Sequence, residues 1–148
     1  MIVPINVYTV PEQLAILKRP AVKGDIGIAS LLAFDLEETA KSHAPNCVGL
    51  ASNQIWTKLD EPTPHVFVAF VEGKWQTFIN ATSLRAGERV SMDEGCMSKP
   101  GLTCKTKRRT RITVTYVDET GKSKKAKFKG FDAIIIQHEL DHMNGTLI

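Results

Sequence analysis

The stretch GFDAIIIQHELDHMNG, residues 130–145, decides the fold of this chain. Apolar residues recur at helical spacing from Phe131 to Met143, which predicts a C-terminal helix. Gly130 marks the change from the two-residue period of the preceding segment, and Asn144-Gly145 is a typical helix stop. We therefore expect the last secondary-structure element to be a helix with one face packed into the core.

Two histidines on this helix are spaced to bind one metal ion. His138 and His142 are four positions apart, so both imidazoles lie on the same helical face. Three apolar residues share that face: Phe131, Ile134 and Ile135. Glu139 lies about 100° around the helix from His138, beside the ion, where a carboxylate can move protons for a bound water. This HExxH pattern in an apolar setting predicts a metal site, against the alternative of two core histidines.

Upstream of this helix the chain alternates as antiparallel strands do. VFVAFV at 66–71 and WQTFIN at 75–80 flank a Glu-Gly-Lys turn, which is a hairpin signal. RITVTYV at 111–117 alternates polar and β-branched residues. The segment at 118–121 then predicts a turn into a basic strand at 124–129. Together these segments predict an antiparallel sheet.

One helix is predicted in the N-terminal part, over residues 26–42, with Asp25 as its N-cap. Its apolar positions near helical spacing are Ile28, Leu31, Leu32, Leu36 and Ala40. Residues 11–18 fit either a short helix or an extended arm. The order helix, strands, helix lacks β-α-β alternation. It therefore predicts a single α+β domain over 1–148, with antiparallel β-strands packed around a C-terminal HExxH helix.

The bulk composition is that of a globular protein. The 148 residues are 43% hydrophobic and 24% charged, enough to form one core. The N-terminus lacks the pattern of a signal peptide, and no stretch approaches the roughly 18 apolar residues that a membrane span needs. Three cysteines are an odd number, which favours a reduced, cytoplasmic compartment over a disulfide framework.

The net charge is +3, and basic residues concentrate in KTKRRTR at 105–111 and KSKKAKFK at 122–129. The interpretation we favour is a solvated strand face and hairpin; the alternative is a contact surface for RNA or the ribosome. Few aromatic residues lie near these runs, which argues against stacking of single-stranded nucleic acid.

The third metal ligand is expected upstream, because only MNGTLI follows His142 and it holds no ligand residue. The candidates are His43, His65, Cys47, Cys96, Cys104 and several carboxylates. Cys96 is preferred, because it follows a predicted strand at 89–92 and because Gly95 lets the backbone approach a ligand closely. Cys104 is interpreted as a small core residue, although spacing alone does not separate the two cysteines. A Cys/His/His set leaves a coordination position for water, as catalytic sites do.

Three segments resemble, in order, the motifs of the peptide deformylase family: VGLASNQ at 48–54, EGCMS at 94–98 and QHELDH at 137–142. The family patterns are GxGLAAxQ, EGCxS and HExDH, and the resemblance covers nearly the whole chain. It implies a metal-dependent hydrolase that removes the N-formyl group from the N-terminal methionine of nascent polypeptides and releases formate.

The resemblance also implies roles for single residues. The metal ligands would be Cys96, His138 and His142, and Glu139 would be the general acid/base. The oxyanion would be stabilised by the side-chain amide of Gln54 and the backbone N–H of Met97. Substrate binding would involve Val48, Gly49, Met92, Gly95, Phe131, Ile134 and Ile135. The metal would be Fe²⁺, with Zn²⁺, Ni²⁺ or Co²⁺ as substitutes.

The predicted partners are the formylmethionyl peptides of nascent chains, with a weak ribosome contact, no membrane and no specific nucleic acid. The chain resembles a short form of the family, without a C-terminal extension beyond the last motif. Cys47 replaces the first glycine of the first motif and Ser52 its second alanine, and Met97 stands where leucine is common. None of these departures affects a ligand or Glu139, so we expect the protein to be active. Any effect of the departures is expected on substrate affinity or side-chain preference.

Two other functions stay open at this point. The first is a different metal-dependent amidase or peptidase on the same scaffold. The second is a structural zinc domain that binds RNA through its basic strands, which requires a fourth protein ligand.

Overall fold

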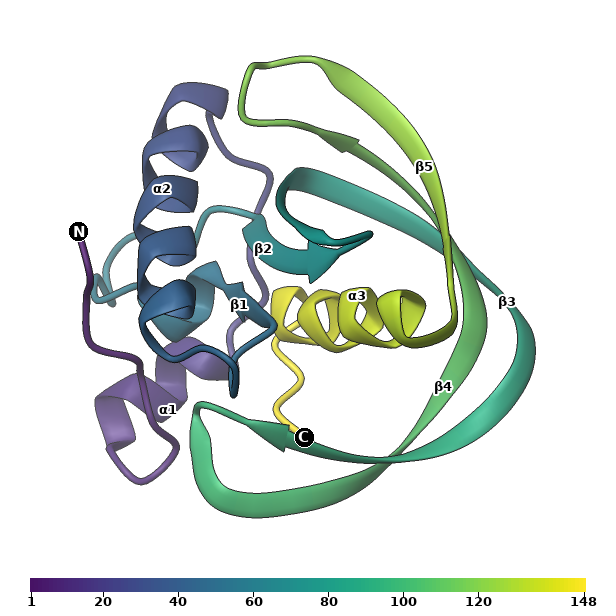
Figure 1. Ribbon diagram of the computed structural model, residues 1–148. Helices are drawn as coiled ribbons and strands as arrows, with labels where there is room; N and C mark the ends of the chain where they lie inside the picture. Colours follow the sequence, from purple (N-terminus) through teal and green to yellow (C-terminus); the bar gives the residue numbers. More distant parts are fainter.

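A computed structural model describes residues 1–148 and shows three helices and a five-stranded antiparallel sheet (Figure 1). The elements in chain order are α1 (Pro11–Leu17), α2 (Ile26–Ser42), β1 (Gly49–Ala51), the 3₁₀ helix η1 (Ser52–Gln54), β2 (Val66–Val71), β3 (Lys74–Cys96), β4 (Lys99–Val117), β5 (Ser123–Lys129) and α3 (Gly130–Met143). The α+β class and the C-terminal helix are therefore confirmed.

The strands follow one another in the sheet in the order β1-β2-β3-β4-β5, each antiparallel to the next. The predicted hairpin between β2 and β3 is present. Glu72 and Gly73 at its turn have φ values of 52° and 77°, the positive pair that a two-residue hairpin needs to match the twist of its strands. The turn into the basic strand is also present, between β4 and β5.

Strands β3 and β4 are long and strongly bent. The predicted strands at 75–80 and 89–92 are parts of the single strand β3, which continues to Cys96. Its register with β4 shifts between Ile79 and Thr82 and between Ala86 and Arg89, and such bulges bend a strand. As a result β3, β4 and β5 curve around α3, which lies on their concave side (Figure 1).

Helix α2 begins as predicted, since the Asp25 carboxylate accepts a hydrogen bond of 3.0 Å from the backbone N–H of Ile28. Its buried face agrees with the expected one at Leu36 and Ala40 and differs elsewhere. The buried residues are Ala29, Ala33, Leu36, Thr39 and Ala40, whereas Ile28 and Leu31 are 56% and 75% exposed. Alanines along the inner face let the helix axis approach the sheet closely, and the larger residues turn outward.

The ambiguous segment at 11–18 is helical, so the protein has two N-terminal helices where one was predicted. Pro11 occupies the first turn of α1. A backbone N–H there would have no acceptor within the helix, so a proline, which lacks this N–H, is tolerated. Ile16 and Leu17 at the other end are buried. None of the helices has the length and apolar character that crossing a membrane requires.

The core has two parts, one on each face of the sheet. Aromatic residues of the strands pack against α3 on one side, where the Phe67 and Phe78 rings stack with centroids 4.8 Å apart. Leu50, Val66 and Val68 pack against α2 on the other side. Strand β2 is buried on both faces, and α3 packs against β1, β2, β4 and β5.

Candidate active site

Three of the predicted metal ligands meet at one point. The ligand atoms of Cys96, His138 and His142 all lie within 4.8 Å of one another, and no other group of this kind is found in the chain. Cys96 ends β3, and its sulfur lies 3.3 Å from Nε2 of His142. His138 and His142 extend from successive turns of α3, with ring centroids 5.0 Å apart. The bend of β3 brings the thiol to the helix.

The two imidazoles have different environments. Burial lowers the pKa of His142 to about 3, so this ring is neutral and offers a lone pair. Burial also acts to lower the pKa of His138, but hydrogen bonds with Cys96 and Glu94 outweigh it and raise that pKa to about 10. The His138 ring therefore lies between a sulfur and a carboxylate, both of which favour positive charge on it.

These residues fit a divalent metal. The sulfur of Cys96 and one imidazole nitrogen from each histidine lie close together, and Nε2 of His142 is the nitrogen that faces the sulfur. The carboxylate of Glu94 contacts Nδ1 of His138 at 2.9 Å, which directs Nε2 of that ring towards the other ligands. A set of three protein ligands leaves a coordination position for water, so a structural four-ligand zinc site is not favoured.

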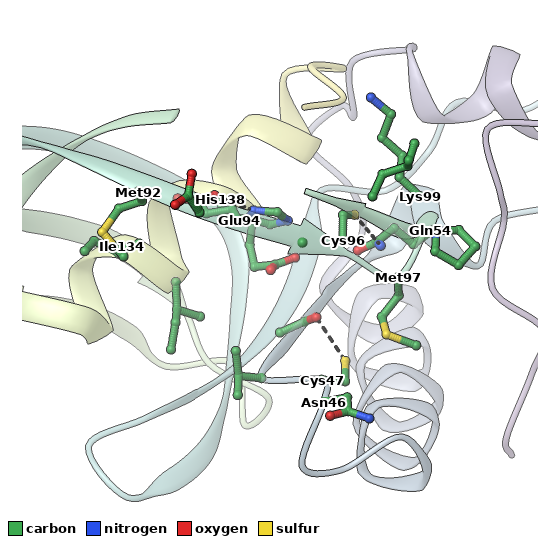
Figure 2. A pocket seen from close by; sticks show the side chains of 18 of the residues that line it. Asn46, Cys47, Gln54, Met92, Glu94, Cys96, Met97, Lys99, Ile134 and His138 are labelled. Carbon is green, nitrogen blue, oxygen red and sulfur yellow. Dashed lines mark hydrogen bonds and ion pairs between the residues drawn. The ribbon is translucent and has the colours of Figure 1, made fainter. Parts of the chain in front are cut away.

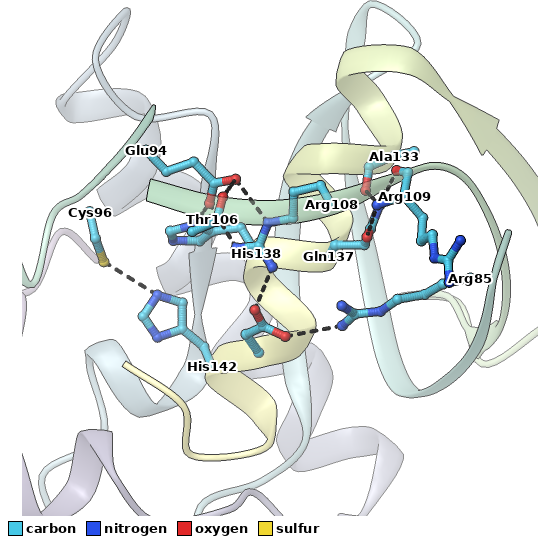
Figure 3. Close-up of polar contacts among 11 residues, drawn as sticks. Arg85, Glu94, Cys96, Thr106, Arg108, Arg109, Ala133, Gln137, His138 and His142 are labelled. Carbon is cyan, nitrogen blue, oxygen red and sulfur yellow. Dashed lines mark hydrogen bonds and ion pairs between the residues drawn. The ribbon is translucent and has the colours of Figure 1, made fainter. Parts of the chain in front are cut away.

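Behind the ligands lies a buried network of charges (Figure 3). Arg108 donates two hydrogen bonds to Glu94, of 2.8 and 2.7 Å, and a third to Asp141. Thr106 donates another to Glu94 at 2.7 Å, and Arg85 contacts Asp141 at 3.0 Å. Burial disfavours the Glu94 carboxylate, but the hydrogen bonds from Arg108 and His138 hold its pKa well below the usual range. Glu94 is therefore a charged residue that orients His138.

Arg108 was not recognised from the sequence as a residue of the site. It lies inside the run 105–111, which was interpreted as solvated, yet its side chain is only 3% exposed. The two-residue period of the strand is the signal that could have identified Arg108 as buried. Arg108 is in phase with the buried residues Ile112 and Val114 of β4, so it points inward, whereas its neighbours Lys107 and Arg111 are exposed. Cys104 is also not a core residue, since it is half-buried on β4 opposite Glu94.

Replacing Arg108 by methionine is expected to destabilise the fold by about 3–5 kcal/mol, because Glu94 and Asp141 would remain as buried carboxylates without their common partner. We also expect about a 10- to 100-fold loss of metal affinity, because His138 would lose its oriented acceptor. Urea unfolding and metal titration measure the two effects. Arg111→Met, on the exposed face of the same strand, is the control and should change stability by less than about 0.5 kcal/mol. Similar losses in both variants would contradict the role of the network.

Glu139 lies beside the ligands in a closed environment. It is 3% exposed, and its Oε1 atom has no hydrogen-bond partner. Burial raises the pKa of Glu139 to about 7, and the neighbouring His138 offsets part of that shift. A carboxyl group whose pKa lies near neutrality can both accept and donate a proton, which is what a general acid/base needs.

Gly49 on β1 is what leaves room for this carboxylate. A Cβ atom at Gly49 would lie 2.5 Å from Oε2 of Glu139 and 2.9 Å from its Cδ. These are the far atoms of a flexible side chain, so the carboxylate would move and the backbone would not. The requirement for glycine at this position therefore concerns the placement of Glu139.

Gly49→Ala is accordingly expected to lower turnover by about 10²-fold with little change in stability or metal content, since a displacement of about 1 Å is enough for such a loss. Turnover at saturating substrate, thermal unfolding and bound metal should be measured together. The control is Gly27→Ala in α2, where a Cβ atom would meet only Oδ1 of Asp25, at 3.2 Å. If Gly49→Ala unfolds the protein or keeps full turnover, glycine is not required at this position for the placement of Glu139.

A cavity of about 490 Å³ opens above the cluster, and Cys96, His138 and Glu139 lie in its wall (Figure 2). All the residues predicted to bind substrate line it: Val48, Gly49, Met92, Gly95, Phe131, Ile134 and Ile135. Met92 and Ile134 lie on one side of His138, and Gln54 and Met97 on the other. The apolar residues needed for a methionine pocket are therefore gathered at one place, although Phe131 is 60% exposed.

The two predicted oxyanion donors also lie in the cavity wall. The amide nitrogen of Gln54 donates to Oγ of Ser98 at 3.1 Å and makes a longer contact of 3.6 Å with the sulfur of Cys96. The Gln54 carbonyl accepts from the backbone N–H of Ala51, which fixes the orientation of the amide. The backbone N–H of Met97 makes no hydrogen bond within the protein and so is free for a substrate atom.

The departures in the first motif are accommodated without strain. Cys47 does not have a positive φ, so this backbone position does not need glycine. Burial raises the pKa of the Cys47 thiol to about 12, and the thiol donates a hydrogen bond of 3.2 Å to the carbonyl of Gly49. Ser52 is fully buried, and its hydroxyl donates to the carbonyl of Pro64 at 2.5 Å.

Comparisons with known proteins identify the family of this chain. The family model described as polypeptide deformylase matches residues 4–148. The peptide deformylase of Chlorobaculum tepidum is 34% identical over 149 residues, which cover 99% of this chain and 78% of that protein. The crystal structure of peptide deformylase from Thermus thermophilus has a TM-score of 0.83 at 32% identity, over 99% of this chain and 83% of that one.

A further match is the actinonin-bound class I type b peptide deformylase from Acinetobacter baumannii, with a TM-score of 0.81 at 25% identity, over 99% and 95% of the two chains. The resemblance seen in the three motifs thus extends to the whole chain and to its fold. The chain belongs to the polypeptide deformylase family.

Proposed function

We propose that this chain, acting as a single catalytic domain over residues 1–148, removes the N-formyl group from the N-terminal methionine of nascent polypeptides in the cytoplasm. The observation that carries the proposal is the cluster of Cys96, His138 and His142 at the wall of a cavity, with the buried Glu139 beside it. Water cleaves the amide bond between the formyl carbon and the methionine nitrogen, and formate and a free amino terminus are released. The three cysteines are free, in keeping with a reducing compartment.

We propose Cys96, His138 and His142 as the ligands of one divalent metal, Fe²⁺ in the native enzyme. Zn²⁺, Ni²⁺ and Co²⁺ are expected to bind as well, because a thiolate and two imidazoles accept several first-row ions. A divalent metal held there would supply Lewis acidity, which would polarise a carbonyl and lower the pKa of a bound water to about 7. The network of Glu94 and Arg108 keeps His138 oriented for this role.

Glu139 is proposed to move the protons of the reaction. Its Oε1 atom lacks a partner, so it can accept the proton of the attacking water. The buried carboxyl, with its raised pKa, can then donate the same proton to the leaving methionine nitrogen. Protein groups around it exclude bulk water, and this strengthens its interaction with charges that develop nearby.

The oxyanion that develops at the formyl oxygen is proposed to be stabilised by the Gln54 amide and the Met97 backbone N–H. The Gln54 amide has a fixed orientation, and its contact with sulfur at 3.6 Å is long enough to be exchanged for a substrate oxygen. Each preorganised donor of this type is commonly worth about 3 kcal/mol in the transition state.

Methionine is proposed to bind among the apolar residues of the cavity, and the peptide to extend along β1. The apolar wall is formed by Val48, Met92, Phe131, Ile134 and Ile135. Strand β1 pairs only with β2, so its other edge is available to an extended peptide, and Gly49 and Gly95 both line the cavity.

The proposal is tested with protein prepared without oxygen and loaded with Fe²⁺ or Ni²⁺. We expect formate release from a formyl-Met tripeptide and at least about 10²-fold lower turnover of the acetyl-Met peptide. Actinonin, which is bound to the relative from Acinetobacter baumannii, should raise the unfolding temperature of the loaded protein. Preference for the acetyl peptide would indicate a different amidase on this scaffold, and no turnover by the loaded protein would refute the function.

A further inference from the structure

The outer face of the sheet carries a row of basic side chains that the catalytic function does not use. Along β4 and β5, residues at odd positions point away from α3, because the even positions include the buried Arg108, Ile112 and Phe128. The cations on this outer face are Lys105, Lys107, Arg109 and Arg111 of β4 and Lys125, Lys127 and Lys129 of β5. We call this set the basic stripe.

The basic stripe is continuous. Arg111 pairs directly with Lys129, and the three lysines of β5 then continue beside Thr113 and Thr115 of β4. With a rise of about 3.3 Å per residue, the span from 105 to 115 extends the stripe over roughly 33 Å. The stripe lies on the convex side of β4 and β5, opposite α3 and the metal ligands (Figure 1). It is therefore free of the catalytic cavity.

The cations of the stripe are largely without counter-charges. Lys105 forms an ion pair with the carboxylate of Asp93 at 3.4 Å. No other member of the stripe has a carboxylate within 4.0 Å. Glu72 and Asp132 border the hollow next to Arg111 but form no ion pair with it. Arg111 and Lys129 are direct cross-strand neighbours, as are Arg89 and Arg109, and like charges in that position destabilise a sheet. A polyanion bound to this face would relieve that repulsion.

The residues between the cations indicate which polyanion fits. Thr113, Thr115 and Ser91 share the outer face, and hydroxyl groups commonly hydrogen-bond to phosphate and sugar oxygens. The aromatic residues of β4 and β5, Tyr116 and Phe128, are buried, so these strands offer no platform on which single-stranded bases could stack. A membrane-binding face would carry exposed aromatic and aliphatic residues among its cations, and Leu84 is the one large apolar residue exposed on this face.

We propose that the basic stripe binds the phosphate backbone of double-helical RNA, without sequence specificity. The choice of RNA rests on the proposed function, because an enzyme that acts on nascent chains works beside the RNA surface of the ribosome. The stripe thus supplies a docking surface on the opposite side of the sheet from the cavity, which leaves the cavity open to the emerging chain.

The test is fluorescence anisotropy with a labelled RNA duplex of about 16 base pairs, at several salt concentrations. We expect the logarithm of the affinity to fall with the logarithm of salt with a slope steeper than about −3, as contact with roughly four phosphates requires. Lys127→Gln combined with Lys129→Gln should reduce that slope by about 2 and lower the affinity about tenfold at low salt. Lys18→Gln with Lys23→Gln removes the same charge from exposed sites off the stripe and should bind as the wild type does.

Equal binding by the two double variants would overturn the proposal, as would absence of RNA binding at low salt. Tighter binding to a DNA duplex of the same sequence or to phosphatidylserine vesicles would also overturn it. Formate release from a formyl-Met tripeptide is measured for every variant in parallel and should not change. A wild type that binds RNA but releases no formate would refute the proposed function, whereas one that releases formate but binds no RNA would refute the stripe alone.

Discussion

Glu139→Gln is expected to lower turnover by about 10³-fold while the metal stays bound. Glutamine keeps the shape of the side chain but cannot accept a proton from water or return it to the leaving amine, a service worth about 10²–10⁴-fold in rate. Glu139 is not among the three clustered ligand residues, so its replacement should leave the metal content near that of the wild type. Formate release and bound metal, measured on one preparation, check both statements.

The unfolding temperature of Glu139→Gln separates a catalytic role from a structural one. A structural role predicts that this variant is less stable than the wild type. Oε1 of Glu139 is buried without a hydrogen bond, and burial raises the pKa of this carboxyl to about 7. An ionised carboxylate in that position opposes folding, so a neutral amide should leave the unfolding temperature unchanged or higher. Loss of stability together with loss of activity would indicate that Glu139 supports the fold, and unchanged turnover would remove it from the reaction.

The parts of the fold that follow from local pattern could be predicted from the sequence. The helix that carries His138 and His142 has a helical period with a stop after it, and α3 spans 130–143, one residue longer at its start than the predicted 131–143. The hairpin at Glu72-Gly73 follows from turn chemistry. Strand β3 could not be predicted at its full length, because bulges at Ile79 and Ala86 interrupt the alternation by which a strand is recognised.

The site could be predicted only where spacing along one element decides it. The positions of His138, Glu139 and His142 follow from one helix. The choice between Cys96 and Cys104 depends on tertiary structure: the two lie on paired strands with Glu94 directly opposite Cys104, and only the end of β3 brings a thiol to the helix. Arg108 was missed for a related reason, since charge alone suggests exposure and only its register on β4 shows that it points inward.

Cys96→Ser is expected to abolish stoichiometric metal binding, whereas Cys104→Ser should retain it. A serine hydroxyl stays protonated and lacks the soft, anionic sulfur that first-row metals prefer, so the remaining pair of imidazoles should bind weakly. Cys104 lies on β4 outside the group of ligand atoms, which makes it the matched control for a thiol replacement.

Metal analysis after desalting measures this difference directly, and cobalt-loaded protein gives an independent spectroscopic check. A thiolate bound to Co²⁺ produces a charge-transfer absorption, which should be present in the wild type and in Cys104→Ser and absent in Cys96→Ser. Turnover should fall in parallel with metal content, because Glu139 and Gln54 would remain in place without the Lewis acid that they assist. Equal loss of metal in the two variants would show that the cluster of Cys96, His138 and His142 is not the binding site, even if the protein deformylates its substrate.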